Sequence, residues 1–167
     1  MTSQPEPMIR RAAIGDVDDL VELIHDLAEY ERSPASVEID RDLLAAALFG
    51  ESPAVFAHVA EDRGRIVGMA IWFLNFSTWT GHHGIYLEDL YVRPEARGLG
   101  TGRALLAALA TVAHRSDYTR IDWSVLDWNE PALRFYRSLG AEPMDEWTGY
   151  RLSGPELAAL AGGEPAT

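Results

Sequence analysis

Apolar residues recur at helical spacing early in the 167-residue chain and alternate with polar residues in several later segments. The spacing predicts a first helix that begins after Asp16 and ends before Pro34, and a second that begins after Asp40 and stops at Gly50. Both aspartates are expected to act as helix N-caps. Alternation over 55–73, interrupted by a Glu-Asp-Arg-Gly turn, predicts a β-hairpin.

The same patterns predict the elements on either side of this hairpin. They are strands over 8–12, 85–92, 121–125 and 147–152, and helices over 104–113, 129–140 and 156–161. The polar, aromatic stretch over 75–84 is expected to be a loop. Residues 1–7 are expected to form a disordered tail and residues 8–167 a single domain of the α/β (α+β) class.

The charge balance narrows the range of partners. Asp and Glu number 26 against 14 Lys and Arg, which gives a formal net charge of −12. Such a surface repels nucleic acid and anionic lipid and attracts cations, so we expect no nucleic-acid or membrane partner. The chain has no cysteine, which excludes a cysteine nucleophile and thiolate metal sites. Cysteine usage and the lack of a secretory leader favour a cytoplasmic location.

The segment from Arg97 to Arg103, Arg-Gly-Leu-Gly-Thr-Gly-Arg, lies between a predicted strand and a predicted helix. Its three glycines allow a tight turn and leave backbone N–H groups uncovered at a helix N-terminus, which suits phosphate oxygens. The segment lacks the Lys-Ser/Thr pair of a P-loop, because Arg103-Ala104 follows instead. It also comes too late in the chain for a dinucleotide-binding fingerprint. A pyrophosphate-bearing ligand is the first hypothesis.

Two motifs together resemble the GNAT superfamily of N-acetyltransferases. They are Arg97-x-x-Gly100-x-Gly102 and Asn129-x-x-Ala132-x-x-Phe135-Tyr136-x-x-x-Gly140. Tyr30-Glu31, the strand from Ile85 to Leu90, and Trp128 to Pro131 are similar to the diamine acetyltransferase branch, which includes spermidine/spermine and thialysine enzymes. The resemblance implies a mixed sheet of about six to seven strands flanked by helices on both faces. It also implies acetyl-coenzyme A as co-substrate, no metal and a homodimer.

The resemblance extends to the residues that hold coenzyme A. The glycine turn would bind the pyrophosphate, a strand edge would pair with the pantetheine arm, and Asn129 would contact the cofactor besides capping its helix. The full predicted cofactor set is Leu90, Tyr91, Val92, Arg97, Gly98, Leu99, Gly100, Thr101, Gly102, Arg103, Asn129, Pro131, Ala132 and Tyr136.

By the same resemblance, Tyr136 is the general acid that protonates the departing thiolate, and Glu88 helps to remove a proton from the amine. Tyr30, Glu31, Trp79, Glu88 and Asp89 form the predicted substrate set, for a small cationic amine. Neighbouring strand residues face opposite sides, so Glu88 and Asp89 can share a cleft only at a β-bulge, which is a family trait. The adjacent His82 and His83 diverge on an extended segment, and we interpret them as surface residues.

Two positions depart from the polyamine enzymes, because Ser77 and Thr148 stand where those enzymes carry acids. Fewer carboxylates should weaken the binding of long polycations, so a short diamine or thialysine is as plausible an acceptor as spermidine. Two alternatives remain open at this point. One is acetylation of an aminoglycoside or a protein amine on the same scaffold. The other is an acyl-coenzyme A binding module without catalysis.

Overall fold

The computed structural model describes residues 6–162, and within them one mixed sheet has the strand order β1-β2-β3-β4-β5. Its strands are β1 (Met8–Arg11), β2 (Val55–Asp62), β3 (Arg65–Ser77), β4 (His82–Val92) and β5 (Ile121–Asp122). Neighbouring strands from β1 to β4 are antiparallel, and β5 joins β4 in parallel. Contacts divide the chain into two units between Leu126 and Asp127, and the sheet belongs to the first of them.

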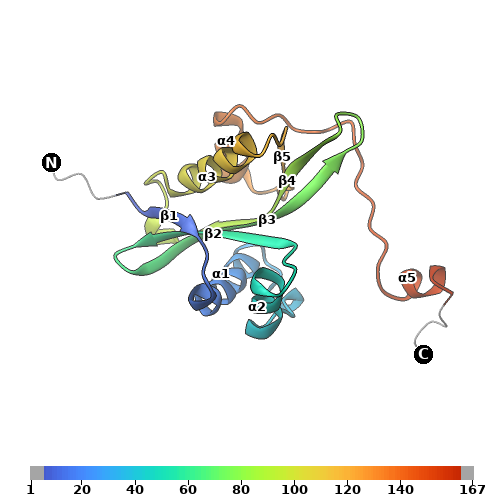
Figure 1. Ribbon diagram of the computed structural model, residues 1–167, viewed down its shortest axis with the longest axis horizontal. Coiled ribbons are helices and arrows are strands. Elements are labelled where there is room, and N and C mark those ends of the chain that lie inside the picture. Colours follow the sequence, from blue (N-terminus) through green and yellow to red (C-terminus); the bar gives the residue numbers. More distant parts are fainter. Residues whose placement is uncertain (1–5, 163–167) are drawn as a thin grey trace. The chain divides into compact units, whose positions relative to one another are not determined.

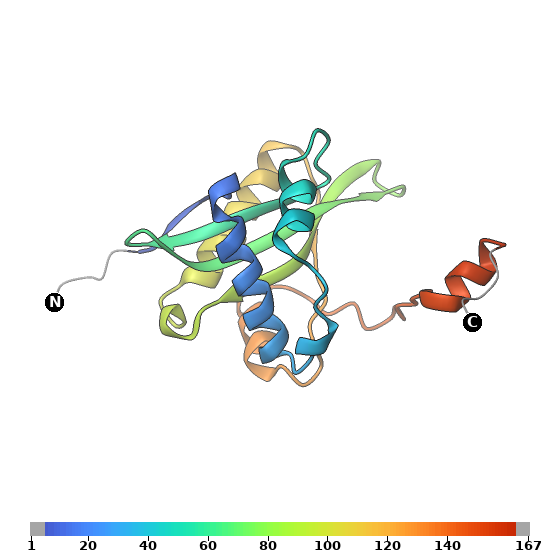
Figure 2. The ribbon, with the colours of Figure 1, turned by 90° about the horizontal axis from the view of Figure 1, so that it is seen from below.

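Helices cover both faces of this sheet. α1 (Val17–Tyr30) and α2 (Arg41–Phe49) lie on one face and α3 (Thr101–Arg115) on the other (Figures 1 and 2). Three short 3₁₀ turns, η1 (Ile14–Asp16), η2 (Pro34–Ser36) and η3 (Pro94–Ala96), connect these elements. The α/β class, the mixed sheet and the two helical layers are therefore confirmed. The expected six to seven strands are corrected to five in the described part of the chain.

The main core lies between the sheet and the helices α1 and α2. Its buried side chains come from these two helices and from β2, β3 and β4, and they are Val17, Leu20, Leu23, Leu44, Leu48, Ala57, Val59, Ile66, Met69, Ile71 and Tyr91. On the opposite face, Leu105 and Leu109 of α3 are fully buried. Burial of this kind stabilises a fold by about 25 cal/mol for each Å² of apolar surface, so two packed faces hold β4 firmly from both sides.

The predicted loop over 75–84 is wrong, because β3 and β4 continue through it as a long hairpin with its turn at residues 78–81. Asn75 and Gly84 are residues typical of loops, yet here they are cross-strand partners. The Asn75 amide donates to Asp122 Oδ2 at 2.8 Å, and a Cβ at Gly84 would lie 2.5 Å from Asn75 Oδ1. The hairpin tip projects beyond the rest of the sheet (Figure 2).

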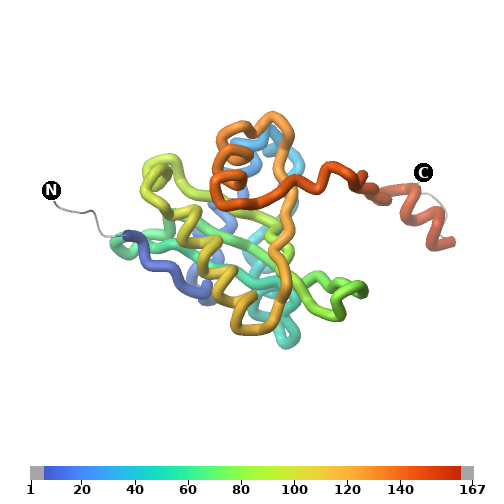
Figure 3. The backbone as a smooth tube through the Cα atoms, turned by 90° about the horizontal axis from the view of Figure 1, so that it is seen from above, coloured from blue at the N-terminus to red at the C-terminus, as the bar shows by residue number. Residues whose placement is uncertain are grey.

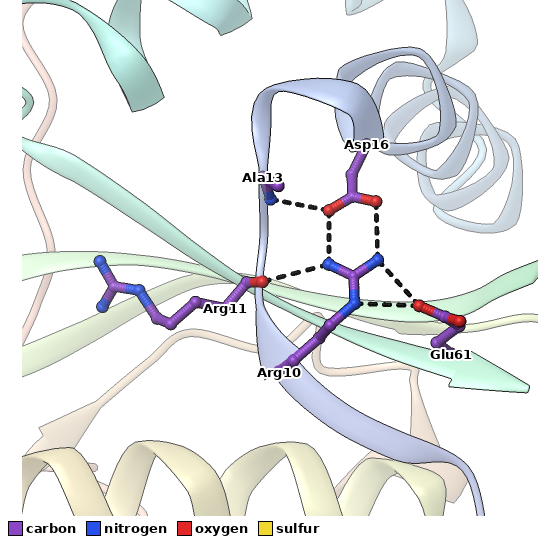
Figure 4. Close-up of polar contacts among 5 residues, drawn as sticks. All are labelled: Arg10, Arg11, Ala13, Asp16 and Glu61. Carbon is purple, nitrogen blue, oxygen red and sulfur yellow. Dashed lines mark hydrogen bonds and ion pairs between the residues drawn. The ribbon is translucent and has the colours of Figure 1, made fainter. Parts of the chain in front are cut away.

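A network of ion pairs and hydrogen bonds joins β1 to the start of α1. Arg10 donates through both terminal nitrogens to Asp16, at 2.7 and 2.9 Å, and through Nε to Glu61 at 2.9 Å (Figure 4). The Ala13 N–H also donates to Asp16. Asp16 therefore precedes α1 as expected but does not cap it, because its oxygens are used by Arg10 and Ala13. Asp40 does cap α2, through the Leu43 N–H at 2.9 Å.

The C-terminal unit contains α4 (Glu130–Ser138) and α5 (Gly154–Leu160). The strand predicted over 147–152 is wrong, since these residues are exposed and no strand of the described chain pairs with them. A strand needs a hydrogen-bonded neighbour, which sequence alternation alone does not supply. The strand predicted over 121–125 shortens to two residues for a related reason, as its pairing with β4 ends at Tyr86. No helix of residues 6–162 has the length and hydropathy of a membrane span.

Candidate active site

The glycine turn lies between η3 and α3, as the sequence predicts (Figure 3). Gly98 and Gly100 have φ angles of +73° and +84°, a left-handed conformation that favours glycine. A Cβ at either position would meet nothing within 4 Å, so the turn is open on the side where a side chain would stand. The buried Thr101 hydroxyl donates to the Ala96 carbonyl at 3.0 Å and fixes the start of the helix.

The turn presents a row of backbone donors. The first helical bond runs from the Ala104 N–H to the Gly100 carbonyl at 2.9 Å, and no described backbone carbonyl accepts from the N–H groups of residues 98–103. These donors sit at the positive end of the helix dipole. Arg103 is exposed in the first turn of α3 and forms no ion pair among residues 6–162. The residues present therefore fit a pyrophosphate.

The edge of β4 beside this turn is unpaired. Beyond Tyr86 no described strand pairs with β4 on the side away from β3. The Arg93 N–H donates to Val67, so alternation turns the backbone groups of Tyr91 toward β3 and those of Leu90 and Val92 toward the open edge. The backbone groups of Leu90 and Val92 therefore face the open edge, and the Tyr91 side chain is buried. The pantetheine contact expected of the backbone from Leu90 to Val92 stays a prediction.

The expected β-bulge is present at Glu88. Ile71 of β3 pairs with Asp89 and Trp72 pairs with Leu87, which leaves Glu88 as the extra residue of β4. A bulge of this kind bends its strand and re-aims a side chain. The bulge lies two residues beyond the end of pairing between β4 and β5, so it belongs to the open edge of β4.

Three carboxylates gather where the bulge meets the end of α1. Asp89 shares a sheet face with Tyr91, and α1 covers this face. Burial raises the pKa of Asp89 to about 6, and the charges of Glu88 and Glu31 add to this shift. Burial also raises the pKa of Glu31, which directly follows α1. The structure thus brings together three members of the predicted substrate set, and their repulsion favours a bound cation.

Tyr30 joins this group through an arginine. The Arg97 guanidinium carbon lies 5.2 Å from the centroid of the Tyr30 ring and 5.4 Å from that of Tyr91. Arg97 Nε donates to the Val92 carbonyl at 2.8 Å. The first residue of the glycine turn therefore contacts both the end of α1 and the open edge of β4.

Trp79 is not brought to the carboxylates. It lies at the tip of the β3–β4 hairpin with 89% of its surface exposed. Asp89 pairs with Ile71, and Ser77 is six residues farther along β3, so about 20 Å of strand separates the tip from the bulge. Ser77 accepts a hydrogen bond from the Thr80 N–H and shapes this tip. The substrate role of Trp79 stays a prediction.

The remaining predicted residues belong to α4. Asn129 precedes this helix and accepts from the Ala132 N–H at 3.4 Å, which confirms the expected cap. Pro131 stands in the first turn. The Tyr136 ring lies 5.3 Å from that of Phe135. Their cofactor and catalytic roles remain predictions.

Sequence reasoning missed Arg93, which is 8% exposed at its side chain and joins the end of β4 to α1. It pairs with Glu22 and Asp26, each at 3.0 Å, and its Nε donates to the Ile66 carbonyl. The four-residue spacing of Glu22 and Asp26 places both acids on one helix face, and that signal predicts a cation opposite them. Within residues 6–162 no group of three or more possible ligands is arranged to hold a metal ion.

Known proteins resemble this chain over most of its length. A sequence profile of the acetyltransferase (GNAT) family matches residues 17–141. A thialysine N-epsilon-acetyltransferase of Bos taurus is 38% identical over 93% of this chain and 97% of the relative. A spermidine/spermine N(1)-acetyltransferase-like protein of Homo sapiens is 30% identical over 96% of this chain but only 24% of its own length.

The fold comparison agrees with these similarities. The structure of an integron cassette protein from the mobile metagenome of V. cholerae matches with a TM-score of 0.79 and 30% identity, over 94% of this chain and 98% of that one. The resemblance found in the sequence is thereby confirmed. The chain belongs to the acetyltransferase (GNAT) family and is an acyl-coenzyme A-dependent N-acetyltransferase.

Proposed function

We propose that the protein transfers an acetyl group from acetyl-coenzyme A to a primary amine of a small diamine, a polyamine or a thialysine-like substrate. The observation that carries the proposal is the group of three carboxylates, Glu31, Glu88 and Asp89, beside the bulge of β4. A second ammonium of the substrate would be held by this charge while the first is acetylated. The names of the bovine and human relatives support the same acceptor class.

Acetyl-coenzyme A would supply an activated acetyl thioester in a ternary complex. The N–H groups of residues 98–103, with Arg103, would hold its pyrophosphate, and the open edge at Leu90 and Val92 would hold its pantetheine amides. A backbone N–H of this edge also suits the charge that develops on the thioester oxygen.

Two proton transfers complete the proposed reaction. An amine is a nucleophile only when neutral, and the carboxylate of Glu88 would accept its proton, directly or through water. Tyr136 would return a proton to the sulfur of the departing coenzyme A, a role that suits a phenol hydroxyl in general. Asn129, Pro131, Ala132 and Tyr136 complete the proposed cofactor set.

We also propose that the protein is a cytoplasmic homodimer. The C-terminal unit exposes large apolar side chains, including Met144, Tyr150 and Leu160, and such surface favours association. The lack of cysteine fits a reducing compartment. Light scattering on the full chain would give twice the 18.5 kDa mass if the dimer forms, and a single mass would contradict it.

Turnover of acetyl-coenzyme A against a panel of amines tests the proposed acceptor. The panel contains putrescine, spermidine, spermine, thialysine, lysine and an aminoglycoside. We expect the highest kcat/KM for thialysine or a short diamine. A clear preference for the aminoglycoside would contradict this acceptor class, and a clear preference for spermine would contradict the expected bias toward short amines. Binding of coenzyme A without turnover of any amine would favour a module that has lost its chemistry.

A further inference from the structure

The side chain of Arg97 does not lie over the backbone donors of the turn that it opens. Its Nε donates to the Val92 carbonyl at 2.8 Å, and its guanidinium carbon lies within 5.5 Å of two tyrosine ring centroids. Tyr30 is the last residue of α1 and precedes the carboxylate of Glu31. Tyr91 is buried in the core under α1. One guanidinium thus contacts two elements: the neighbouring residues Tyr91 and Val92 of β4, and Tyr30 at the end of α1, which is distant in the sequence.

Arginine is suited to this position and lysine is not. The planar guanidinium of an arginine stacks on aromatic rings while its Nε–H donates in the same plane. A lysine ammonium keeps the charge, but lysine has no N–H donor at the Nε position and no planar group that can stack on a ring. The geometry therefore uses the shape of Arg97 as well as its charge.

Arg103 provides the contrast within the same turn. It is exposed, it belongs to the first helical turn behind the N–H row, and it forms no ion pair in the part of the chain that the structure describes. Among residues 6–162, no ion pair connects it with α1. A phosphate contact by charge is the role that its position supports.

We propose that Arg97 is a positioning residue that couples the coenzyme A turn to the amine site through Tyr30. The proposal rests on the proposed function. A phosphate bound by the N–H row would fix the backbone of residues 97–100, and with it the base of the Arg97 side chain. The guanidinium then holds Tyr30, and with it the adjoining Glu31, in the position that receives the amine. Coupling between two sites is reciprocal, so a bound amine must tighten coenzyme A binding by the same factor.

Calorimetry with coenzyme A, which has no acetyl group to transfer, measures this coupling without turnover. The measured quantity is the Kd for coenzyme A without amine divided by the Kd for coenzyme A with saturating amine. The amine is the best substrate of the panel. For the wild-type protein we expect a ratio of about five or more, which is the lower range of known coupling. Arg97→Lys should bring the ratio close to one, and so should Tyr30→Ala.

Two matched variants serve as controls. One removes a positive charge from the turn without removing Arg97, and the other changes Tyr30 without removing its aromatic ring. Arg103→Ala should weaken coenzyme A binding with and without amine and leave the ratio unchanged. Tyr30→Phe keeps the ring and should keep the ratio. Thermal unfolding of each variant verifies that it is folded, and Arg97 and Tyr30 are exposed enough for the substitutions to be tolerated.

The outcomes distinguish this inference from the proposed function. If the wild-type protein acetylates an amine but its ratio is one, or if Arg97→Lys retains the wild-type ratio, the coupling role is wrong and the acetyltransferase assignment stands. If no amine binds or reacts at all, the proposed acceptor class fails and the coupling falls with it.

Discussion

Arg93 Nη1 donates to Asp26 Oδ2 at 3.0 Å and connects the end of β4 to the middle of α1. The arginine side chain is 8% exposed, whereas its partners Asp26 and Glu22 are 33% and 59% exposed. The pair therefore combines a desolvated cation with carboxylates that water still reaches. It holds together the two elements whose ends carry Asp89 and Glu31.

Arg93→Ala should destabilise the fold by roughly 2–4 kcal/mol, because it opens a cavity at a buried side chain and leaves the Ile66 carbonyl without its Nε donor. Urea unfolding at pH 7 measures the change. Arg65→Ala is the matched control, since Arg65 pairs with Glu95 at the same 3.0 Å but both side chains are more than half exposed. Its effect should stay within about 1 kcal/mol. Equal losses in the two variants would contradict the role given to Arg93.

Gly100→Ala should weaken acetyl-coenzyme A binding by about tenfold to a hundredfold. The new Cβ stands on the open side of the turn and strains a φ of +84°, so one or two N–H contacts to phosphate are lost. Gly81→Ala is the control, as Gly81 has a φ of +70° and equally open surroundings at the hairpin tip. Both variants should lose about 1 kcal/mol of stability, while only Gly100→Ala should raise the KM for acetyl-coenzyme A. A rise in both KM values would mean that strain, and not the phosphate site, is responsible.

Asp89→Asn should stabilise the protein above pH 6 and weaken amine binding. The folded state raises the pKa of Asp89 to about 6 from 3.8, so the folded protein binds more protons between these values. Stability contributed at this site is therefore lost as pH rises through that window. At pH 8 the variant should gain roughly 1–3 kcal/mol, and at pH 4 the gain should vanish.

Thermal unfolding at pH 8 and pH 4, together with the KM for the amine, tests this trade between stability and binding. Asp62→Asn, at the last residue of β2, should alter neither quantity by a measurable amount. An Asp89→Asn protein with unchanged amine KM would remove Asp89 from the substrate set. A loss of stability at pH 8 would show that the carboxylate is held by a favourable contact instead.

His58→Gln should reduce the acid sensitivity of the fold. Burial lowers the pKa of His58 to about 4 from 6.5, and the charge of Arg11 adds to this effect. The unfolded chain binds more protons between these values, so stability present above pH 6.5 is lost as pH falls toward 4. The loss attributable to this residue is about 2–3 kcal/mol. Glutamine still offers an acceptor to the Trp72 indole, which donates to His58 at 3.1 Å.

Urea unfolding of wild type and His58→Gln at pH 7.5 and pH 4.5 checks this prediction. Both proteins retain Asp89, whose contribution to stability has the opposite pH dependence. This contribution therefore cancels in the difference between their free energies of unfolding. His25→Gln serves as the control at a histidine outside the core. If the free energy of unfolding falls equally between pH 7.5 and pH 4.5 in the wild type and in His58→Gln, His58 does not cause the acid sensitivity.

Tyr136→Phe should lower kcat by about 100-fold or more with little change in the KM for acetyl-coenzyme A, because only the proton donated to the sulfur is removed. Tyr150→Phe is the control in the same unit, at a side chain that is 95% exposed. Steady-state kinetics over pH 6–10 measure both. Unchanged kcat in Tyr136→Phe would exclude this hydroxyl as the general acid.

Local patterns in the sequence determined the helices and the chemistry of the turn. Amphipathic spacing identified α1 and α2, the Asp40 and Asn129 caps were found from their residue types, and the glycines of residues 98–102 predicted an open turn suited to phosphate. These features depend on contacts within a few residues of chain, so single-sequence rules describe them. The family resemblance rested on the same local motifs.

Only the tertiary structure decided which strands find partners and which charges meet. The hairpin over 65–92 extends through Asn75 and Gly84 because Asp122 accepts from Asn75, and residues 147–152 form no strand because no described neighbour pairs with them. The pKa of Asp89 is raised because the fold buries its carboxyl beneath α1, and because the charges of Glu88 at the bulge and Glu31 at the end of α1 lie near it. Ladder pairing and electrostatic environment join residues distant in the chain, and the one-dimensional pattern does not contain those distances.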